Sequence, residues 1–144
     1  MLALLAAFAL VLAMAVPAFA EEAGATYTLT INNANGTYEA YQIFSGDLSV
    51  NDGKKVLSNI QWGSGVDATK MGGESAATVA ESLTKSALAE SFAESLVSNS
   101  KLSSVKAIAK AKNETAVFTG LSAGYYLVKN SSIDSGKTLS LIHI

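Results

Sequence analysis

The segment Thr37–Val66 constrains the fold of this chain most strongly, because it predicts two β-strands joined by a tight turn. Alternate residues of its first half fall on one face of an extended strand: Tyr38, Ala40, Gln42 and Phe44. Tyr41 and Ile43 fall on the opposite face. Asn51-Asp52-Gly53 then supplies turn chemistry, since Asn and Gly tolerate the positive φ angles of a tight reversal. A second alternating run follows on one face of the returning strand: Val56, Ser58, Ile60 and Trp62.

Further alternating runs predict additional strands on both sides of this hairpin. Apolar residues alternate with threonines over Tyr27–Ile31, and the Asn-rich stretch 32–36 predicts a turn before the hairpin. Ala116–Leu121 and Tyr125–Lys129 predict two more strands joined by a short turn. Val105–Lys112 fits either the end of a helix or an edge strand with outward lysines.

The stretch Ser75–Asn99 is helical in character, because it is rich in Ala, Leu and Glu and contains neither Gly nor Pro. Its first apolar stripe comprises Ala76, Val79, Ala80, Leu83 and Ala87. A second stripe, on nearly the opposite side of one helix, comprises Leu88, Phe92 and Leu96. One straight helix cannot bury both stripes against one core, so we predict two helices with a break between Thr84 and Ala87. The chain is therefore expected to be mainly β with an α insertion.

The first 20 residues predict a signal peptide. They form an uncharged apolar run that ends in an A-x-A cleavage site at Ala18 and Ala20, so the mature chain is expected to start at Glu21. An uncleaved membrane anchor is the alternative, since a run of this length just spans a bilayer. No Lys or Arg precedes the apolar run, which favours a true start codon upstream of Met1.

The last six residues, Leu139–Ile144, break from the polar stretch before them. They match the translation of a transposon-end adapter used in sequencing libraries. We therefore predict that residues 139–144 are a non-native tail and that His143, the only histidine, has no function. A natural apolar strand is the alternative.

Composition excludes several classes of function. The chain has no cysteine. Its ten basic residues are all lysines and its net charge is −2, and both facts disfavour nucleic-acid binding, which normally uses a basic patch with arginines. Without Cys or a functional His, thiol chemistry, His-based triads and the usual zinc sites are not expected. We predict a solvated helix face for Glu90 and Glu94, and a turn rather than a calcium loop around Asp47 and Asp52. No enzyme activity, metal or cofactor is expected.

The stretch from Phe118 to Val128 follows the pattern F-x-x-L-x-x-G-x-Y-x-L, with valine at the last position. Together with the predicted hairpin, it resembles the N-terminal domain of sortase-assembled, isopeptide-forming fimbrial (pilus shaft) proteins of Gram-positive bacteria. The residues that carry the resemblance are Tyr38, Tyr41, Phe44, Trp62, Phe118, Leu121, Gly124 and Tyr126.

The resemblance implies a fold, a location and partners. The fold is an immunoglobulin-like β-sandwich over residues 21–138, lacking its last strand or strands and carrying a two-helix excursion. The implied role is a non-enzymatic structural subunit that packs head-to-tail in a cell-surface pilus. Its partners would be other pilin subunits and a sortase. The protein would be secreted, would meet the membrane only during export, and would be anchored to the cell wall through sequence beyond residue 144. The resemblance does not identify any ligand on a host surface.

The resemblance also implies an internal Lys–Asn amide bond, and here this chain departs from the family. Many relatives carry the lysine at the position of Gln42, and a glutamine side chain cannot act as the amine. We therefore expect no isopeptide bond through residue 42. Because Gln42 shares a predicted apolar face, we expect it to be buried and hydrogen-bonded. Lys129 and Lys137 are further amines, predicted to be solvated.

Two other functions fit the sequence. One is a ligand-binding domain of a wall-anchored adhesin. The other is a noncatalytic carbohydrate-binding module of a secreted hydrolase, in which Trp62, Tyr125 and Tyr126 would stack on sugars. For these three aromatic residues we favour a role in the core of the domain.

Overall fold

A computed structural model of the chain describes residues 26–83, 86–131 and 139–143. The predicted leader, Met1–Ala20, lies outside these residues. The elements follow in the order β1 (Tyr27–Asn32), β2 (Thr37–Asn51), β3 (Lys54–Trp62), a 3-10 turn η1 (Ala68–Lys70), α1 (Ala76–Ser82), α2 (Ser86–Ser98), β4 (Ala107–Lys110), β5 (Thr115–Leu121), β6 (Gly124–Asn130) and β7 (Leu139–His143). The chain is thus mainly β with a helical insertion, as the sequence predicts.

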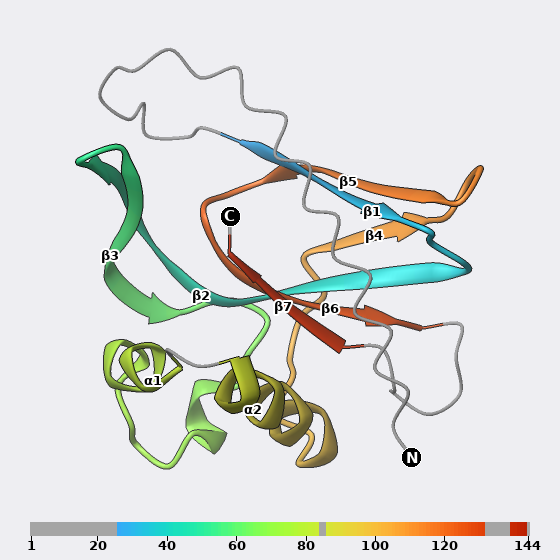
Figure 1. Cartoon of the computed structure of the whole chain (residues 1–144). Coiled ribbons are helices and arrows are strands. Elements are labelled where there is room, and N and C mark those ends of the chain that lie inside the picture. The colour runs from blue at the N-terminus through green and yellow to red at the C-terminus, as the bar shows by residue number, and fades with distance from the viewer. Residues whose placement is uncertain (1–25, 84–85, 132–138, 144) are drawn as a thin grey trace.

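The strands form two antiparallel sheets that pack face to face (Figure 1). The smaller sheet pairs β1 with β5, and the larger has the order β3-β2-β6-β7, with β4 also paired to β2. The 15-residue strand β2 organises the larger sheet, because β3 and β4 follow one another along one of its edges and β6 occupies the other. One core cluster lies between the sheets: Leu29, Ala34, Tyr38, Ala40, Ala109, Ala116, Phe118, Leu121, Tyr126 and Val128.

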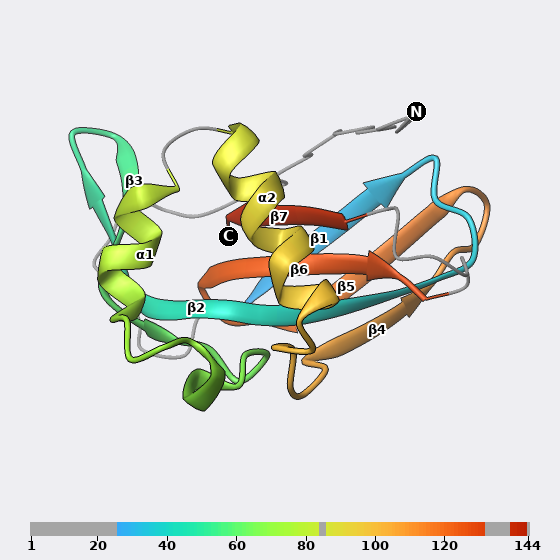
Figure 2. The same cartoon turned by 90° about the horizontal axis from the view of Figure 1, so that it is seen from below.

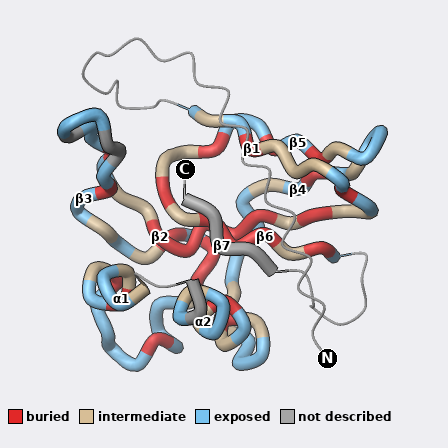
Figure 3. The backbone as a smooth tube through the Cα atoms, in the orientation of Figure 1, coloured by how far each residue is buried: buried red, intermediate tan, exposed pale blue. Residues whose placement is uncertain are grey.

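The helices cover the other face of the larger sheet, so its central strands are buried on both sides (Figure 3). A second core cluster fills this layer: Tyr41, Ile43, Phe44, Val66, Met71, Ala76, Val79, Ala93, Leu96 and Leu127. Strands covered on both faces must be apolar at successive positions rather than at alternate ones. This requirement explains why Tyr41–Phe44 and Tyr126–Val128 are buried without interruption.

A β-bulge in β2 corrects the predicted face of Phe44. The register with β6 shifts between Gln42 and Phe44: Gln42 pairs with Tyr126 and Phe44 with Tyr125, so the residue between them, Ile43, has no partner on β6. Such a residue bends the strand and reverses the faces beyond it. Phe44 therefore lies in the helix-side cluster with Tyr41 and Ile43, and not with Tyr38 on the side of the small sheet.

The returning strand β3 carries a second irregularity. Its register with β2 shifts between Ser45 and Asp47, and Asn59 has a φ of 50° in that interval. Beyond the shift the predicted alternation is wrong, because Val56 is exposed and Leu57 is buried. The predicted turn is confirmed, since Asp52 and Gly53 both have positive φ.

Two helices replace one, as predicted. α1 ends at Ser82 and α2 begins at Ser86, slightly before the expected break. Ser75 caps α1 by accepting a hydrogen bond from the backbone N–H of Thr78. The predicted second stripe is wrong at Leu88, which is 48% exposed, because the buried side of α2 is centred on Ala93 and Leu96. No helix in the described part of the chain is long and apolar enough to span a bilayer.

The ambiguous segment Val105–Lys112 contains the edge strand β4. Ala109 is buried against Tyr38, its neighbour on β2, while Lys106 and Lys110 are exposed. Of the two predicted alternatives, the structure therefore shows the edge strand with outward lysines.

Candidate functional site

Gln42 is buried and hydrogen-bonded, as predicted. Its side chain is 6% exposed, and Nε2 donates to Ser122 Oγ at 3.1 Å and to the carbonyl oxygen of Ala123 at 3.4 Å. These contacts join residues 80 positions apart, one at the bulge of β2 and the others in the turn between β5 and β6. The neutral amide of Gln42 thus links the two sequence blocks that carry the resemblance, the predicted hairpin and the stretch from Phe118 to Val128.

The loop Gly63-Ser64-Gly65 covers the backbone of Gln42 on the edge of β2 between β3 and β4. The backbone N–H of Gly65 donates to the carbonyl oxygen of Gln42 at 2.8 Å. The backbone N–H of Gly63 donates to the carbonyl oxygen of Ile43, also at 2.8 Å. A Cβ atom on either glycine would collide with backbone atoms of Gln42. Glycine is needed at both positions because the loop replaces a paired strand on this edge.

The family-pattern residues of the second block form one packed corner. Phe118, Leu121 and Tyr126 are almost fully buried. The hydroxyl of Tyr126 donates to the carbonyl oxygen of Ser122, four residues upstream, at 2.8 Å, and lies 3.2 Å from Ser122 Oγ. Burial raises the pKa of Tyr126, so its phenol stays protonated and able to donate. Gly124 closes the corner with a φ of 152°, against the carbonyl of Phe44.

An aromatic cluster surrounds Phe44 on the helix side of the sheet. Its ring stacks on Trp62 with centroids 5.2 Å apart and on Phe92 at 6.0 Å, and meets Tyr125 edge-on at 5.9 Å. The indole N–H of Trp62 donates to the carbonyl oxygen of Glu74, which ties β3 to the start of the helical insertion. The structure thus places Trp62 and Tyr125 in the packing around Phe44, as the core interpretation predicts, and fully buries Tyr126.

One buried phenol has an acidic neighbour. The hydroxyl of Tyr41 donates to Glu39 Oε2 at 2.9 Å. Burial and this hydrogen bond to a carboxylate raise the pKa of Tyr41 to about 12. Lys129 lies directly across from Glu39 in the register of β2 and β6, but no ion pair joins the two side chains.

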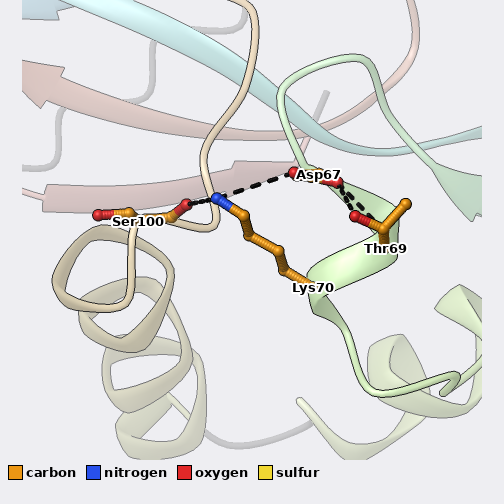
Figure 4. A network of polar contacts seen from close by, with 4 residues as sticks. All are labelled: Asp67, Thr69, Lys70 and Ser100. Carbon is orange, nitrogen blue, oxygen red and sulfur yellow. Dashed lines mark hydrogen bonds and ion pairs between the residues drawn. The ribbon is translucent and has the colours of Figure 1, made fainter.

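A polar network that the sequence did not indicate joins η1 to the end of α2 (Figure 4). Asp67 caps η1 by accepting hydrogen bonds from Thr69, and these bonds lower the pKa of Asp67. Lys70 Nζ donates to the carbonyl oxygen of Ser100 at 2.9 Å and lies 3.8 Å from Asp67. The lysine charge lies at the C-terminal end of α2, where the helix dipole favours a cation. The only signal in the sequence was an Asp three residues before a Lys, a spacing too common to predict this network.

The remaining predicted chemical groups are placed as follows. Glu90 and Glu94 are exposed on α2, as expected. Asp47 Oδ2 accepts a hydrogen bond from Asn59 Nδ2 at 2.7 Å. Within the described ranges, no three His, Cys, Asp or Glu side chains gather closely enough to hold a metal ion. Lys129 is half-buried, and Lys137 lies outside the described residues.

No protein-family model, curated protein or solved structure matches this chain. The resemblance to pilins therefore stays a prediction from the residues that carry it.

Proposed function

We propose that the chain is a non-enzymatic structural subunit of a cell-surface pilus. In this proposal it is exported, packs head-to-tail with other subunits and is joined to them by a sortase. One observation supports it most: the two sequence blocks that resemble pilins meet at the turn between β5 and β6, where the side chain of Gln42 donates a hydrogen bond to Ser122, 80 residues away. Residues selected together by one fold would be expected to meet in this way.

We further infer an immunoglobulin-like β-sandwich. Tyr126 lies near the start of β6, and its hydroxyl bonds the backbone four residues upstream. A tyrosine corner of this kind is a hallmark of immunoglobulin-like sandwiches. The packing of two antiparallel sheets around Phe118 and Tyr126 agrees with the inference.

The sortase proposal is tested in the source bacterium with an antibody against the chain. Boiled cell-wall extracts should show a ladder of covalent polymers, and a strain lacking the sortase gene should show only the monomer. A single wall-linked band without a ladder would instead indicate the adhesin. Release of monomer into the medium by both strains would contradict both assignments.

We predict that the mature chain contains no internal isopeptide bond. Formation of a Lys–Asn amide releases ammonia, so a cross-linked chain would be about 17 Da lighter than its sequence mass. Intact-mass spectrometry should therefore show no deficit, because the buried side chain at the family position is the amide of Gln42.

The matched variant is Gln42→Lys, which restores the amine. It should also lack the deficit, because the side chain of residue 42 contacts Ser122 Oγ and the carbonyl oxygen of Ala123, and its hydrogen-bond partners among the described residues include no asparagine side chain. A loss of one ammonia in the unmodified chain would overturn the prediction and direct attention to Lys106, Lys110, Lys112 and Lys129.

A further inference from the structure

The turn between β1 and β2 contains the only asparagine of the chain that is followed by glycine, Asn35 before Gly36. Gly36 has a φ of 88°, a backbone angle that residues with a side chain rarely adopt. Asn35 has an exposed side chain. The shape of the turn therefore requires glycine at position 36, and this requirement leaves the amide of Asn35 beside a backbone nitrogen that no Cβ atom shields.

Hydrogen bonds hold the backbone of this turn to two other segments. The carbonyl oxygen of Asn35 accepts a hydrogen bond from Nδ2 of Asn130, at the end of β6, at 2.8 Å. The next carbonyl oxygen, that of Gly36, accepts one from the backbone N–H of Ala111, just after β4, also at 2.8 Å. Figure 2 shows the turn beside the one that joins β4 to β5, at the end of the molecule where β6 also ends. The spacing of these two carbonyl groups is therefore matched to two different partners.

The two groups that can react with each other in this turn have no such bonds. Within the part of the chain that the structure describes, neither the side-chain amide of Asn35 nor the backbone N–H of Gly36 makes a hydrogen bond. By contrast, the side-chain amides of Asn59 and Asn130 both donate hydrogen bonds. Asn35 thus combines an exposed amide carbon, which is an electrophile, with an unbonded neighbouring nitrogen, which is a nucleophile once its proton is lost.

We propose that Asn35 is a site of spontaneous deamidation. The nitrogen of Gly36 attacks Cγ of Asn35, and the new C–N bond closes a cyclic succinimide. The side-chain nitrogen leaves as ammonia and takes up the proton that Gly36 has lost. Water then adds to the ring and is the only other reactant. Opening at the side-chain carbonyl gives aspartate, and opening at the backbone carbonyl gives isoaspartate, in which the main chain runs through the former side chain.

The two products affect the turn differently. Isoaspartate inserts a carbon atom into the backbone between residues 35 and 36, so the carbonyl groups that bind Asn130 and Ala111 no longer have their matched spacing. Aspartate adds the same negative charge but leaves the backbone unchanged. Conversion to isoaspartate therefore loosens the contact of this turn with the ends of β4 and β6. The inference goes beyond the proposed pilus role, because the reaction needs only the turn and water.

The test is peptide mapping by mass spectrometry of the purified chain during storage in neutral buffer. The peptide that contains Asn35 should gain about 1 Da, the difference between an amide and a carboxyl group. The gain should be at least about tenfold faster than at Asn113, a difference of about 1.4 kcal/mol in activation free energy. Asn113 is the matched control within the chain, because it is also exposed in a turn but is followed by Glu114, whose side chain hinders attack by its nitrogen.

Two variants separate the steps. Asn35→Gln keeps a side-chain amide but lengthens the ring that must close, so conversion at residue 35 should be lost. The fold should be retained, because the printed contacts of Asn35 involve only its backbone. Asn35→Asp carries the added charge without the inserted carbon, and its midpoint of urea unfolding should equal that of the unmodified chain. The isoaspartyl fraction of the stored chain, separated by chromatography, should unfold at a lower urea concentration.

Several results would contradict the proposal. These are conversion at Asn35 no faster than at Asn113, equal conversion in Asn35→Gln, a product that is aspartate alone, or an isoaspartyl fraction as stable as Asn35→Asp. The succinimide hydrolyses readily in neutral water and should not accumulate, so the expected absence of an ammonia deficit is unchanged. None of these measurements involves a sortase, so their failure would leave the pilus ladder unaffected, and the converse also holds.

Discussion

Replacement of Phe44 by alanine is expected to lower the free energy of unfolding by about 3–5 kcal/mol, the usual effect of emptying a large aromatic site in a packed core. Phe44 is 1% exposed and contacts the rings of Trp62, Phe92 and Tyr125. These three rings come from β3, α2 and β6, so the cavity would be shared by three elements.

The measurement is urea denaturation followed by far-UV circular dichroism, because the fluorescence of Trp62 would change with its stacking partner. The control is Val50→Ala on the same strand. Val50 is 68% exposed, so its truncation should change stability by no more than about 0.5 kcal/mol. A loss below about 1 kcal/mol for Phe44→Ala would show that the cluster does not hold the insertion on the sheet.

Substitution of alanine for Gly124 is the second change with a large expected effect. Two penalties act together at this position. The φ of 152° is one that residues with a side chain rarely adopt, and the new methyl group would run into the carbonyl oxygen of Phe44 on the paired strand. We expect a loss of about 3–5 kcal/mol, the sum of backbone strain and overpacking.

Gly120→Ala separates the two penalties. Gly120 has a φ of 70°, but nothing lies within 4 Å of the place its Cβ would occupy. The free energy of unfolding of this variant should fall only by the cost of backbone strain, about 1–2 kcal/mol. Equal losses in thermal or urea unfolding for the two variants would show that Gly124 is required for its backbone angle alone and not for the close approach of β6 to β2.

Local pattern predicted the elements of this chain well, because helices and strands express their own periodicity in the residues that form them. The turn at Asp52-Gly53 and the two helices in place of one follow from neighbouring residues. Gln42 could also be predicted to be buried and hydrogen-bonded, since a polar side chain on an apolar face must find a partner.

Alternation failed where tertiary contacts altered it. Phe44 changed faces because pairing with β6 imposes a bulge, and a register shift depends on a strand about 80 residues away. Leu88 was predicted to be buried and is exposed, since the orientation of α2 is decided by the sheet on which it packs. No local signal contains either fact.

The sequence by itself determined most of the strands, both helices and the residues that can supply chemistry, but it left Val105–Lys112 open between helix and strand. Only the tertiary structure decided that Gln42 meets Ser122, that Trp62 and Tyr125 surround Phe44, and that Lys70 reaches the end of α2. The physical reason is the range of the interactions. Propensity and periodicity act over a few residues, whereas register, bulges and the neighbours of an exposed charge are fixed by hydrogen bonds and packing between segments distant in the chain.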